Sequence, residues 1–391
     1  MKREAVIVSA VRTAIGKQGG ALATVPAHIF GAEVIKEAVK RANVQPEEID
    51  DVILGNVLSG GGNIARLTAL QTGLSINLPG LTVDRQCGSG INAVVLVAQA
   101  IQAGAGDIYV AGGVESMSRA PYLMDRPERA YSPALPKFRK SQLSPKDIGD
   151  PPMGITAENL VEKYGISREE QDEYALRSQK RMAQAMENGY FDEQIVPITI
   201  PVRKGEPVIF NKDEHPRPNT TLEVLAKLPP VFLEDGTVTA GNSSGLNDAA
   251  AALVVMSREK AIELGLAPLA VIRESAVACV DPNIMGIGPV PATKKVMEKS
   301  GLSLDDMDII ELNEAFASQV IACDRELSFD PEKLNVNGGS IAHGHPLGAT
   351  GAILITKAVY ELKRRSGRYA LITACIGGGQ GIALIIEREE S

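Results

Sequence analysis

The stretch Val83-Asp84-Arg85-Gln86-Cys87-Gly88-Ser89-Gly90 lies between two apolar runs. The run before it, 78–83, predicts a strand, and the run after it, 91–101, predicts a buried helix because it is apolar almost all round. A thiol at such a turn lies beside unpaired backbone N–H groups and the positive end of the helix dipole. This predicts a lowered pKa and a reactive thiolate at Cys87. A small buried cysteine in a glycine-rich turn fits the same stretch equally well.

The composition is that of an ordinary globular protein, with 391 residues, 44% of them hydrophobic and 23% charged. The length predicts two or three domain-sized units, and the net charge of −8 argues against a nucleic-acid partner. The apolar stretches are too short to span a membrane, and the charged start, 1–4, is unlike a signal peptide. The cysteines are scattered and form no CxxC pair, so we expect no metal site, no disulfide framework and a cytoplasmic protein.

Strand-like and helix-like segments alternate in the first part of the chain. Strands are predicted at 5–9, 51–55 and 107–113, and a helix at 31–42. Such alternation predicts a mostly parallel sheet with helices on both faces.

The middle of the chain has a different texture. Residues 119–146 carry seven lysines and arginines against two acidic residues, among many prolines, which predicts an extended excursion from the core. The charge fits an anion-binding surface for a phosphorylated ligand, although a solvated loop explains it more simply. A capping box, Ser167-Arg168-Glu169-Glu170, predicts a helix that ends at Asn188. The Gly/Asn/Ser-rich run 241–248 fits either a plain turn or a pocket lining.

The last part of the chain repeats the order of the first. Strand-like segments recur at 269–280, 308–312, 334–337 and 368–374, and a glycine-rich loop, 338–348, precedes a helix. We infer an internal duplication with two related α/β halves. A pseudo-twofold axis would bring Cys87 and His345, one from each loop, to one crevice at the carboxyl ends of the strands.

Two further residues complete a possible reaction centre. Cys375 ends the last repeated strand, and Asn313 follows the strand at 309–312. Two thiols in different roles suit a reaction in which one carries an acyl group and the other moves a proton at carbon. An imidazole would keep the nucleophile ionised and polarise a carbonyl oxygen.

These motifs resemble those of the thiolase family and span nearly the whole chain. The matching motifs are VDRQCGSG at 83–90, GNSSGLNDAAA at 241–251, NEAF at 313–316, NVNGG and GHPLGATG within 335–351, and CIGGGQG at 375–381. The resemblance implies a duplicated α/β fold in five αβαβα layers. It divides the chain into an N-terminal half (1–118, completed by 246–268), a CoA-binding loop domain (119–245) and a C-terminal half (269–391). It also implies a homodimer or homotetramer.

The resemblance implies a role for each catalytic residue. Cys87 would be the acylated nucleophile, and Cys375 would move the α-proton. His345 would activate Cys87 and form an oxyanion hole with a water held by Asn313. The backbone N–H groups of Cys87 and Gly377 would form a second oxyanion hole.

The resemblance also implies substrate-binding residues. Ser244 would contact the pantetheine part of CoA, and Arg217 would lie near the nucleotide phosphate. The acyl pocket would be bordered by Met153, Met285, Ala315 and Phe316. For Met285 and Phe316, ordinary core packing explains the residues nearly as well.

The implied activity is acetyl-CoA C-acetyltransferase: two acetyl-CoA form acetoacetyl-CoA and CoA reversibly through an acyl-cysteine. CoA and acyl-CoA are substrates, and no cofactor or metal is expected. Pro152-Met153-Gly154 stands where short-chain biosynthetic members usually have His-Met-Gly, whereas Cys-Gly-Ser-Gly is similar to the acetoacetyl-CoA branch. A degradative 3-ketoacyl-CoA thiolase of fatty-acid β-oxidation therefore stays an alternative.

Other functions remain to be weighed. Decarboxylating ketoacyl synthases resemble this fold but generally carry histidine in place of Cys375. A non-catalytic acyl-CoA or lipid-binding protein on a thiolase scaffold would not need the two thiols and His345, and a Cys/His/Asn protease would leave Cys375 unexplained.

His343 departs from the family pattern, which usually has an apolar residue there. It either perturbs His345 or faces solvent. We expect it to face solvent, because glycines make the loop flexible.

Overall fold

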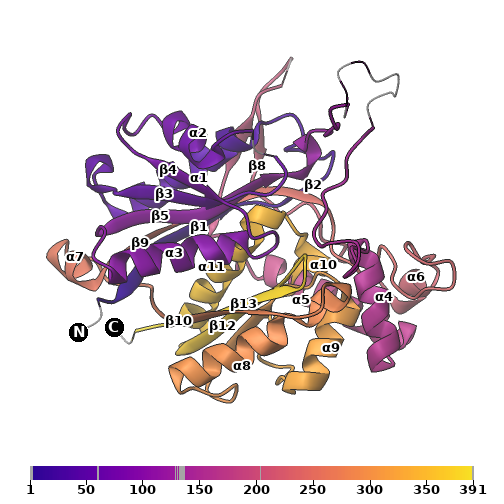
Figure 1. Cartoon of the computed structure of the whole chain (residues 1–391). Helices are drawn as coiled ribbons and strands as arrows, with labels where there is room; N and C mark the ends of the chain where they lie inside the picture. Colours follow the sequence, from indigo (N-terminus) through magenta and orange to yellow (C-terminus); the bar gives the residue numbers. More distant parts are fainter. Residues whose placement is uncertain are drawn as a thin grey trace.

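The computed structural model describes residues 3–59, 61–127, 129, 131, 137–202 and 204–389. Two α/β halves enclose a pair of central helices, and an insertion extends from the first half (Figure 1). The first half contains β1 (Ala5–Thr13), β2 (Gly16–Lys17), α1 (Ala27–Ala42), β3 (Asp51–Gly55), α2 (Ile64–Gln71), β4 (Gly80–Val83), α3 (Ser89–Gln102), β5 (Ile108–Ser116) and β9 (Asn247–Ser257). The second contains β10 (Ala270–Cys279), α8 (Pro289–Ser300), β11 (Ile309–Leu312), α9 (Ala317–Leu327), α10 (Ser340–His343), α11 (Leu347–Arg365), β12 (Tyr369–Ile376) and β13 (Gln380–Glu387).

The order of the strands confirms the duplication. The first half has the order β4-β3-β5-β9-β1, and the second has β11-β12-β13-β10. The two edges are joined where β1 and β10 pair antiparallel at Val6 and Val271. The sheet is mixed rather than mostly parallel, because β9 runs antiparallel to both β1 and β5, and β13 runs antiparallel to β12 and β10.

The five expected layers are present. α3 and α11 lie between the two half-sheets, while α1 and α2 cover one outer face and α8 and α9 cover the other (Figure 1). α3 is therefore apolar almost all round, because a sheet lies on each side of it. Three hydrophobic clusters fill the spaces between the layers.

The predicted strand at 334–337 is wrong. It is reduced to one parallel bridge, between Ile310 and Leu334. Asn335 has a φ of 46°, which no strand tolerates. Its side chain instead takes over the pairing with β11, since it accepts from the Leu312 N–H and donates to the Leu312 carbonyl, both at 2.9 Å.

The insertion contains its own small elements. They are η2 (Met117–Arg119), α4 (Met153–Tyr164), α5 (Arg168–Glu187), β6 (Ile195–Val196), β7 (Ile198–Ile200), β8 (Val208–Phe210) and α6 (Leu222–Ala226), and α7 (Arg258–Glu263) follows β9. The capping box is confirmed, because Ser167 and Glu170 exchange the expected bonds at the start of α5. Within the proline-rich excursion, Tyr122, Met124 and Phe138 are exposed, as expected of a segment outside the core. Its residues 128, 130 and 132–136, which include Glu128, lie outside the described residues.

Among the described residues, none of the helices combines the length and the apolar character that a bilayer crossing requires.

Candidate active site

Cys87 lies in a tight turn between β4 and α3. Gln86 before it has a φ of 45°, and the Asp84 carboxylate accepts from the Gln86 N–H at 2.8 Å. The Ser89 hydroxyl donates to the Gln86 carbonyl and accepts from the Arg85 N–H. The turn is thus held by its own side chains, with the thiol next to the first turn of α3.

Glycine contacts bring the starts of α3 and α11 together. A Cβ on Gly90 would lie 2.6 Å from the Ala352 backbone nitrogen, and a Cβ on Gly351 would lie 2.3 Å from the Ile91 nitrogen. Side chains larger than hydrogen would therefore separate the helices. Because Cys87 precedes α3 and His345 precedes α11, this close crossing holds the two loops at one end of the central layer, as the duplication predicted.

Burial has the largest effect on the ionisation of Cys87. Burial raises the pKa of its thiol to about 11, and the nearby Asp84 and Glu115 carboxylates act in the same direction. The backbone N–H groups of Gly377 and of Cys87 itself lie at the sulfur and lower the pKa less than burial raises it. The expectation of a lowered pKa is therefore wrong: the resting Cys87 is a thiol.

Cys375 is the next-to-last residue of β12 and is fully buried. Burial, followed by the neighbouring Cys87, raises its pKa well above the usual value, so it also rests as a thiol. Gly378 and Gly379, both with φ near 80°, then turn the chain into β13. This hairpin places the Gly377 N–H at the sulfur of Cys87 while Cys375 stays beside it.

His345 presents one free ring nitrogen. Its Nδ1 lies 2.7 Å from the Thr350 hydroxyl, and its backbone N–H donates to the Asn247 side chain at 2.9 Å. Burial lowers the pKa of His345 to about 4, so the resting ring is neutral. Nε2 is buried without a partner among the described residues. The ring is therefore a neutral base with an unoccupied acceptor.

Asn313 has a similar arrangement at the end of β11. Its backbone N–H donates to the Thr373 carbonyl, and its Oδ1 accepts from the Ser340 hydroxyl at 2.6 Å. Its Nδ2 is buried without a partner among the described residues. An N–H donor is thus available for a water or an oxyanion.

Sequence reasoning missed two buried carboxylates that join distant segments around the site. Glu314 accepts from Tyr174 and Ser178 on α5, from Asn335, and from the Ile341 N–H on α10. Glu115 accepts from four backbone N–H groups, in residues 57, 58, 59 and 348. Glu314 lies within the matched NEAF motif and Glu115 outside every motif, but neither pattern indicates a role, because their partners come from distant parts of the chain.

The expected substrate residues fall into two groups. Met285, Ala315 and Phe316 form one apolar cluster with Cys375, against which Met153 packs. Arg217 lines a cleft of about 120 Å³ together with His215, Gln179 and Leu228. Ser244 adjoins the first group, since it donates its backbone N–H to the Ala315 carbonyl at 3.0 Å.

A buried ion pair anchors the segment that carries Arg217. Arg12 of β1 donates to both oxygens of Asp213, at 2.7 and 3.0 Å, and each side chain is 1% exposed. The Arg217 N–H donates to Gln179 of α5 at 2.9 Å. The segment is thus fixed to both the sheet and the insertion, a feature that sequence reasoning also missed.

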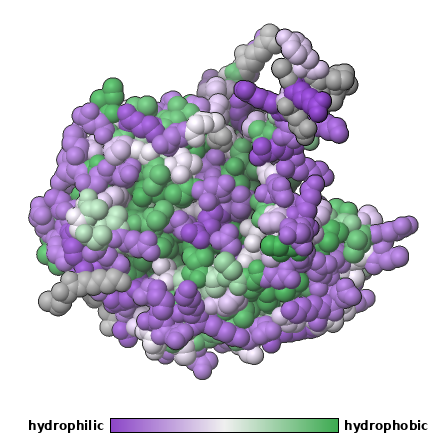
Figure 2. All heavy atoms as spheres, in the orientation of Figure 1, coloured by the Kyte–Doolittle hydropathy of each residue, from purple (hydrophilic) through white to green (hydrophobic). Residues whose placement is uncertain are grey.

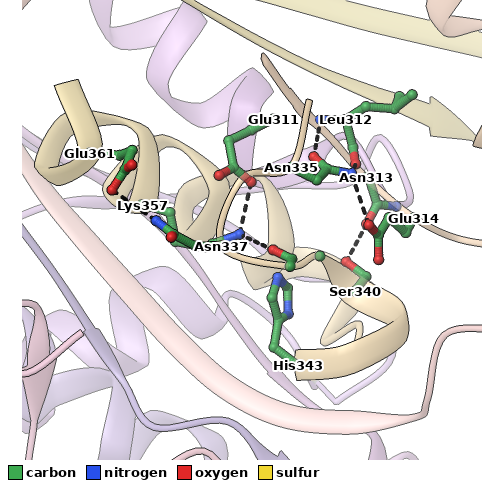
Figure 3. A network of polar contacts seen from close by, with 12 residues as sticks. Glu311, Leu312, Asn313, Glu314, Asn335, Asn337, Ser340, His343, Lys357 and Glu361 are labelled. Carbon is green, nitrogen blue, oxygen red and sulfur yellow. Dashed lines mark hydrogen bonds and ion pairs between the residues drawn. The ribbon is translucent and has the colours of Figure 1, made fainter. Parts of the chain in front are cut away.

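His343 does not face solvent, so that expectation is wrong. It belongs to α10 and is 1% exposed. Its side chain points inward, toward the network of polar side chains that includes Lys357 (Figure 3). Its Nδ1–H donates to the Gly344 carbonyl at 2.8 Å. Burial, followed by the charges of Lys357 and Arg12, lowers its pKa well below the usual value. Gly338 and Gly344, both at positive φ, turn this segment into the core instead of making it flexible.

Replacing His343 with leucine is expected to reduce the loss of stability in mild acid. The unfolded chain binds a proton below about pH 6.5, whereas the folded imidazole does not. Stability is therefore lost as the pH falls below that value, by up to about 1.4 kcal/mol per pH unit, until the lower folded pKa is reached. Urea unfolding of both proteins at about pH 7.5 and about pH 5.5 measures this difference. An equal acid loss in both proteins would contradict the prediction.

Family models and relatives agree over the full length. The model "Thiolase, N-terminal domain" matches residues 5–259, and "Thiolase, C-terminal domain" matches residues 266–388. The acetyl-CoA acetyltransferase of Cupriavidus necator is 48% identical, over 99% of this chain and 100% of its own length. The beta-ketothiolase BktB of the same organism is 50% identical, with coverage of 99% and 100%.

Two solved structures extend this comparison. The Bacillus anthracis acetyl-CoA acetyltransferase superposes with a TM-score of 0.95 at 49% identity, over 99% of both chains. Human mitochondrial 3-ketoacyl-CoA thiolase in complex with CoA superposes with a TM-score of 0.92 at 44% identity, over 99% of this chain and 98% of that one.

Proposed function

The chain belongs to the thiolase family and is an acyltransferase, and from that premise we propose how its residues perform the reaction. The activity is acetyl-CoA C-acetyltransferase, in which two acetyl-CoA and acetoacetyl-CoA plus CoA interconvert. The observation that carries the residue assignment is the hairpin at 375–379. It holds the Gly377 N–H at the sulfur of Cys87 and a second thiol, Cys375, beside it.

In thiolysis, Cys87 attacks the 3-keto carbon of acetoacetyl-CoA while His345 Nε2 takes the thiol proton. Both groups rest neutral, with pKa values of about 11 and about 4, so the proton moves with the attack and not before it. The oxyanion then forms beside the N–H groups that the site presents.

Cleavage of the carbon–carbon bond releases the acetyl-CoA carbanion, which takes the proton of Cys375. The raised pKa of this thiol keeps its proton available at rest. CoA then gives its thiol proton to the Cys375 thiolate, attacks the acetyl group on Cys87, and leaves as the second acetyl-CoA. His345 returns the first proton to Cys87, and synthesis is the reverse.

The remaining assignments concern the substrates. The apolar cluster around Cys375 supports an acyl pocket bordered by Met153, Met285, Ala315 and Phe316. The cleft that Arg217 lines supports CoA binding by this residue, and we assign Ser244 to the same substrate. Both lie in a loop domain at 119–245, between the half 1–118, completed by 246–268, and the half 269–391. CoA is a substrate in this scheme, and the thioester and N–H donors supply the electronic stabilisation without a cofactor.

An assay of acetoacetyl-CoA thiolysis tests the function, and a series of longer 3-ketoacyl-CoA substrates tests the alternative. The similarity to the human 3-ketoacyl-CoA thiolase supports including that series. Preference for long chains would favour the degradative alternative. No turnover of any member would favour a non-catalytic acyl-CoA-binding protein.

Replacing Arg217 with alanine is expected to raise the KM for CoA about 5- to 10-fold with little change in kcat. The side chain is exposed, and an exposed ion pair with a phosphate contributes about 1 kcal/mol. Lys180→Ala is the control, because it removes an exposed cation on α5, and it should leave the KM for CoA unchanged. A KM for CoA that stays at the wild-type value in Arg217→Ala would remove this residue from the CoA site.

We propose a homodimer or homotetramer. β4 hydrogen-bonds only to β3 among the described strands, and Leu67, Leu70 and Leu81 are each more than 40% exposed on α2 and β4. Apolar side chains gather in patches on an otherwise mostly polar face in Figure 2. Sedimentation velocity distinguishes monomer, dimer and tetramer.

The four unpaired cysteines support a reducing, cytoplasmic location.

A further inference from the structure

His345 and Asn313 each have one polar side-chain atom bound to a hydroxyl and another without a partner among the described residues. His345 Nε2 and Asn313 Nδ2 are both buried without a partner among the described residues. The other polar atom of each group contacts a hydroxyl: His345 Nδ1 contacts Thr350, and Asn313 Oδ1 contacts Ser340. Both hydroxyls are fully buried.

The Thr350 hydroxyl has only one hydrogen, and its direction is determined by the helix. It donates to the Pro346 carbonyl at 3.1 Å, the bond back to residue i−4 that threonine makes in helices. The oxygen can then only accept from His345, at 2.7 Å. The proton therefore resides on Nδ1, and Nε2 carries the lone pair.

The Ser340 hydroxyl has the corresponding effect on Asn313. An amide oxygen has no hydrogen, so the 2.6 Å contact requires the hydroxyl to donate. This orientation leaves Nδ2, a donor, on the open side. Ser340 is itself held in α10, because the following residue, Ile341, donates its N–H to Glu314. Figure 3 shows the Ser340 hydroxyl directed at Asn313.

We propose that Thr350 and Ser340 are positioning residues that determine which atoms His345 and Asn313 present to the substrate. Thr350 presents the His345 lone pair, which takes the Cys87 proton as the sulfur–carbon bond forms. The same nitrogen, now protonated, donates to the 3-keto oxygen of acetoacetyl-CoA, and it returns the proton to Cys87 once CoA has taken the acetyl group. Ser340 presents the Asn313 N–H to the water at the same oxygen. The proposal rests on the thiolase mechanism above and adds two residues to it.

Thr350→Val keeps the shape of the side chain and removes the hydroxyl. We expect kcat for acetoacetyl-CoA thiolysis to fall about 10- to 100-fold, because the imidazole loses the group that sets its tautomer. The KM for CoA should stay unchanged, since Thr350 is not among the residues that line the Arg217 cleft. Thr350→Ser should restore most of the rate.

Thr356→Val is the matched control. Thr356 lies on the same helix, is equally buried, and makes the same bond to residue i−4, at 2.9 Å to Ala352. It has no contact with a catalytic side chain among its hydrogen bonds. Equal kcat values for Thr350→Val and Thr356→Val would overturn the role of Thr350.

Ser340→Ala tests the second hydroxyl, with Ser318→Ala as control. Ser318 is also fully buried and donates to the Ala157 carbonyl on α4. We expect kcat to fall about 10-fold in Ser340→Ala and to stay near wild type in Ser318→Ala. A reversed order of effects would overturn the role of Ser340.

The tautomer can be measured without any variant, so the proposal stays testable if Thr350→Val fails to fold. The chain has only four histidines, and ¹⁵N-histidine labelling reports which ring nitrogen carries the proton. A proton on Nδ1 of His345 supports the proposal, and a proton on Nε2 overturns it. Loss of the proposed function would be seen separately, as a wild-type protein that does not cleave acetoacetyl-CoA.

Discussion

Cys87→Ala is expected to abolish both acetylation of the protein by acetyl-CoA and thiolysis of acetoacetyl-CoA. The loss should reach about four orders of magnitude or more, because no other group at the turn can form the covalent intermediate. The half-reaction is measured as transfer of labelled acetyl from acetyl-CoA to protein, and thiolysis as consumption of acetoacetyl-CoA.

Cys279→Ala is the control for loss of a thiol. Cys279 is exposed at the end of β10, so its removal should leave both activities and the melting temperature unchanged. Retention of protein acetylation in Cys87→Ala would show that another residue is the nucleophile. Peptide mass spectrometry of the acetylated wild-type protein would then identify it.

Cys375→Ala is expected to separate the two half-reactions. Transfer of acetyl from acetyl-CoA to Cys87 needs no proton transfer at carbon, so it should remain within about 10-fold of wild type. Thiolysis and condensation should fall about 10²- to 10⁴-fold, because the carbanion loses its proton donor. Parallel measurement of the two reactions in one protein makes the comparison internal.

Cys323→Ala controls for the loss of a buried thiol as such. Cys323 is also fully buried, and its thiol donates to the Gly286 carbonyl. Similar losses of thiolysis in Cys323→Ala and Cys375→Ala would mean that packing, and not proton transfer, explains the effect. Cys375→Ser keeps most of the side-chain volume, so it separates the effect of a cavity from the effect of losing the proton donor.

The pKa values of Cys87 and His345 predict how the acetylation rate depends on pH. Burial raises the pKa of Cys87 to about 11 and lowers that of His345 to about 4, so both stay in their neutral resting forms between these values. We therefore expect the acetylation rate to be nearly flat across neutral pH and to fall in acid, as His345 becomes protonated.

Much of the architecture followed from local sequence patterns. The apolar run at 91–101 predicted a helix buried on all sides, and α3 does lie between two half-sheets. The capping box at 167–170 correctly predicted the start of α5. These features depend on residues within a few turns of one another, where periodicity and capping apply directly. The repeated order of elements likewise revealed the two halves.

Three of the expectations that failed did so because tertiary neighbours decide them. Cys87 was expected to be ionised by the start of α3, but burial has the larger effect on its pKa. His343 was expected in solvent, but α10 carries it into the core. The strand at 334–337 was replaced by side-chain bonds from Asn335 to Leu312. Burial and long-range hydrogen bonds involve parts of the chain that no local pattern connects.

The sequence by itself determined the types of residue at the site, the two halves and the turn that carries Cys87. Only the tertiary structure decided their protonation and orientation. The hydroxyls of Thr350 and Ser340 set which atoms of His345 and Asn313 are free, and the hairpin after Cys375 places the Gly377 N–H at the Cys87 sulfur. The physical reason is that desolvation and hydrogen-bond direction depend on what surrounds a group in space, not along the chain.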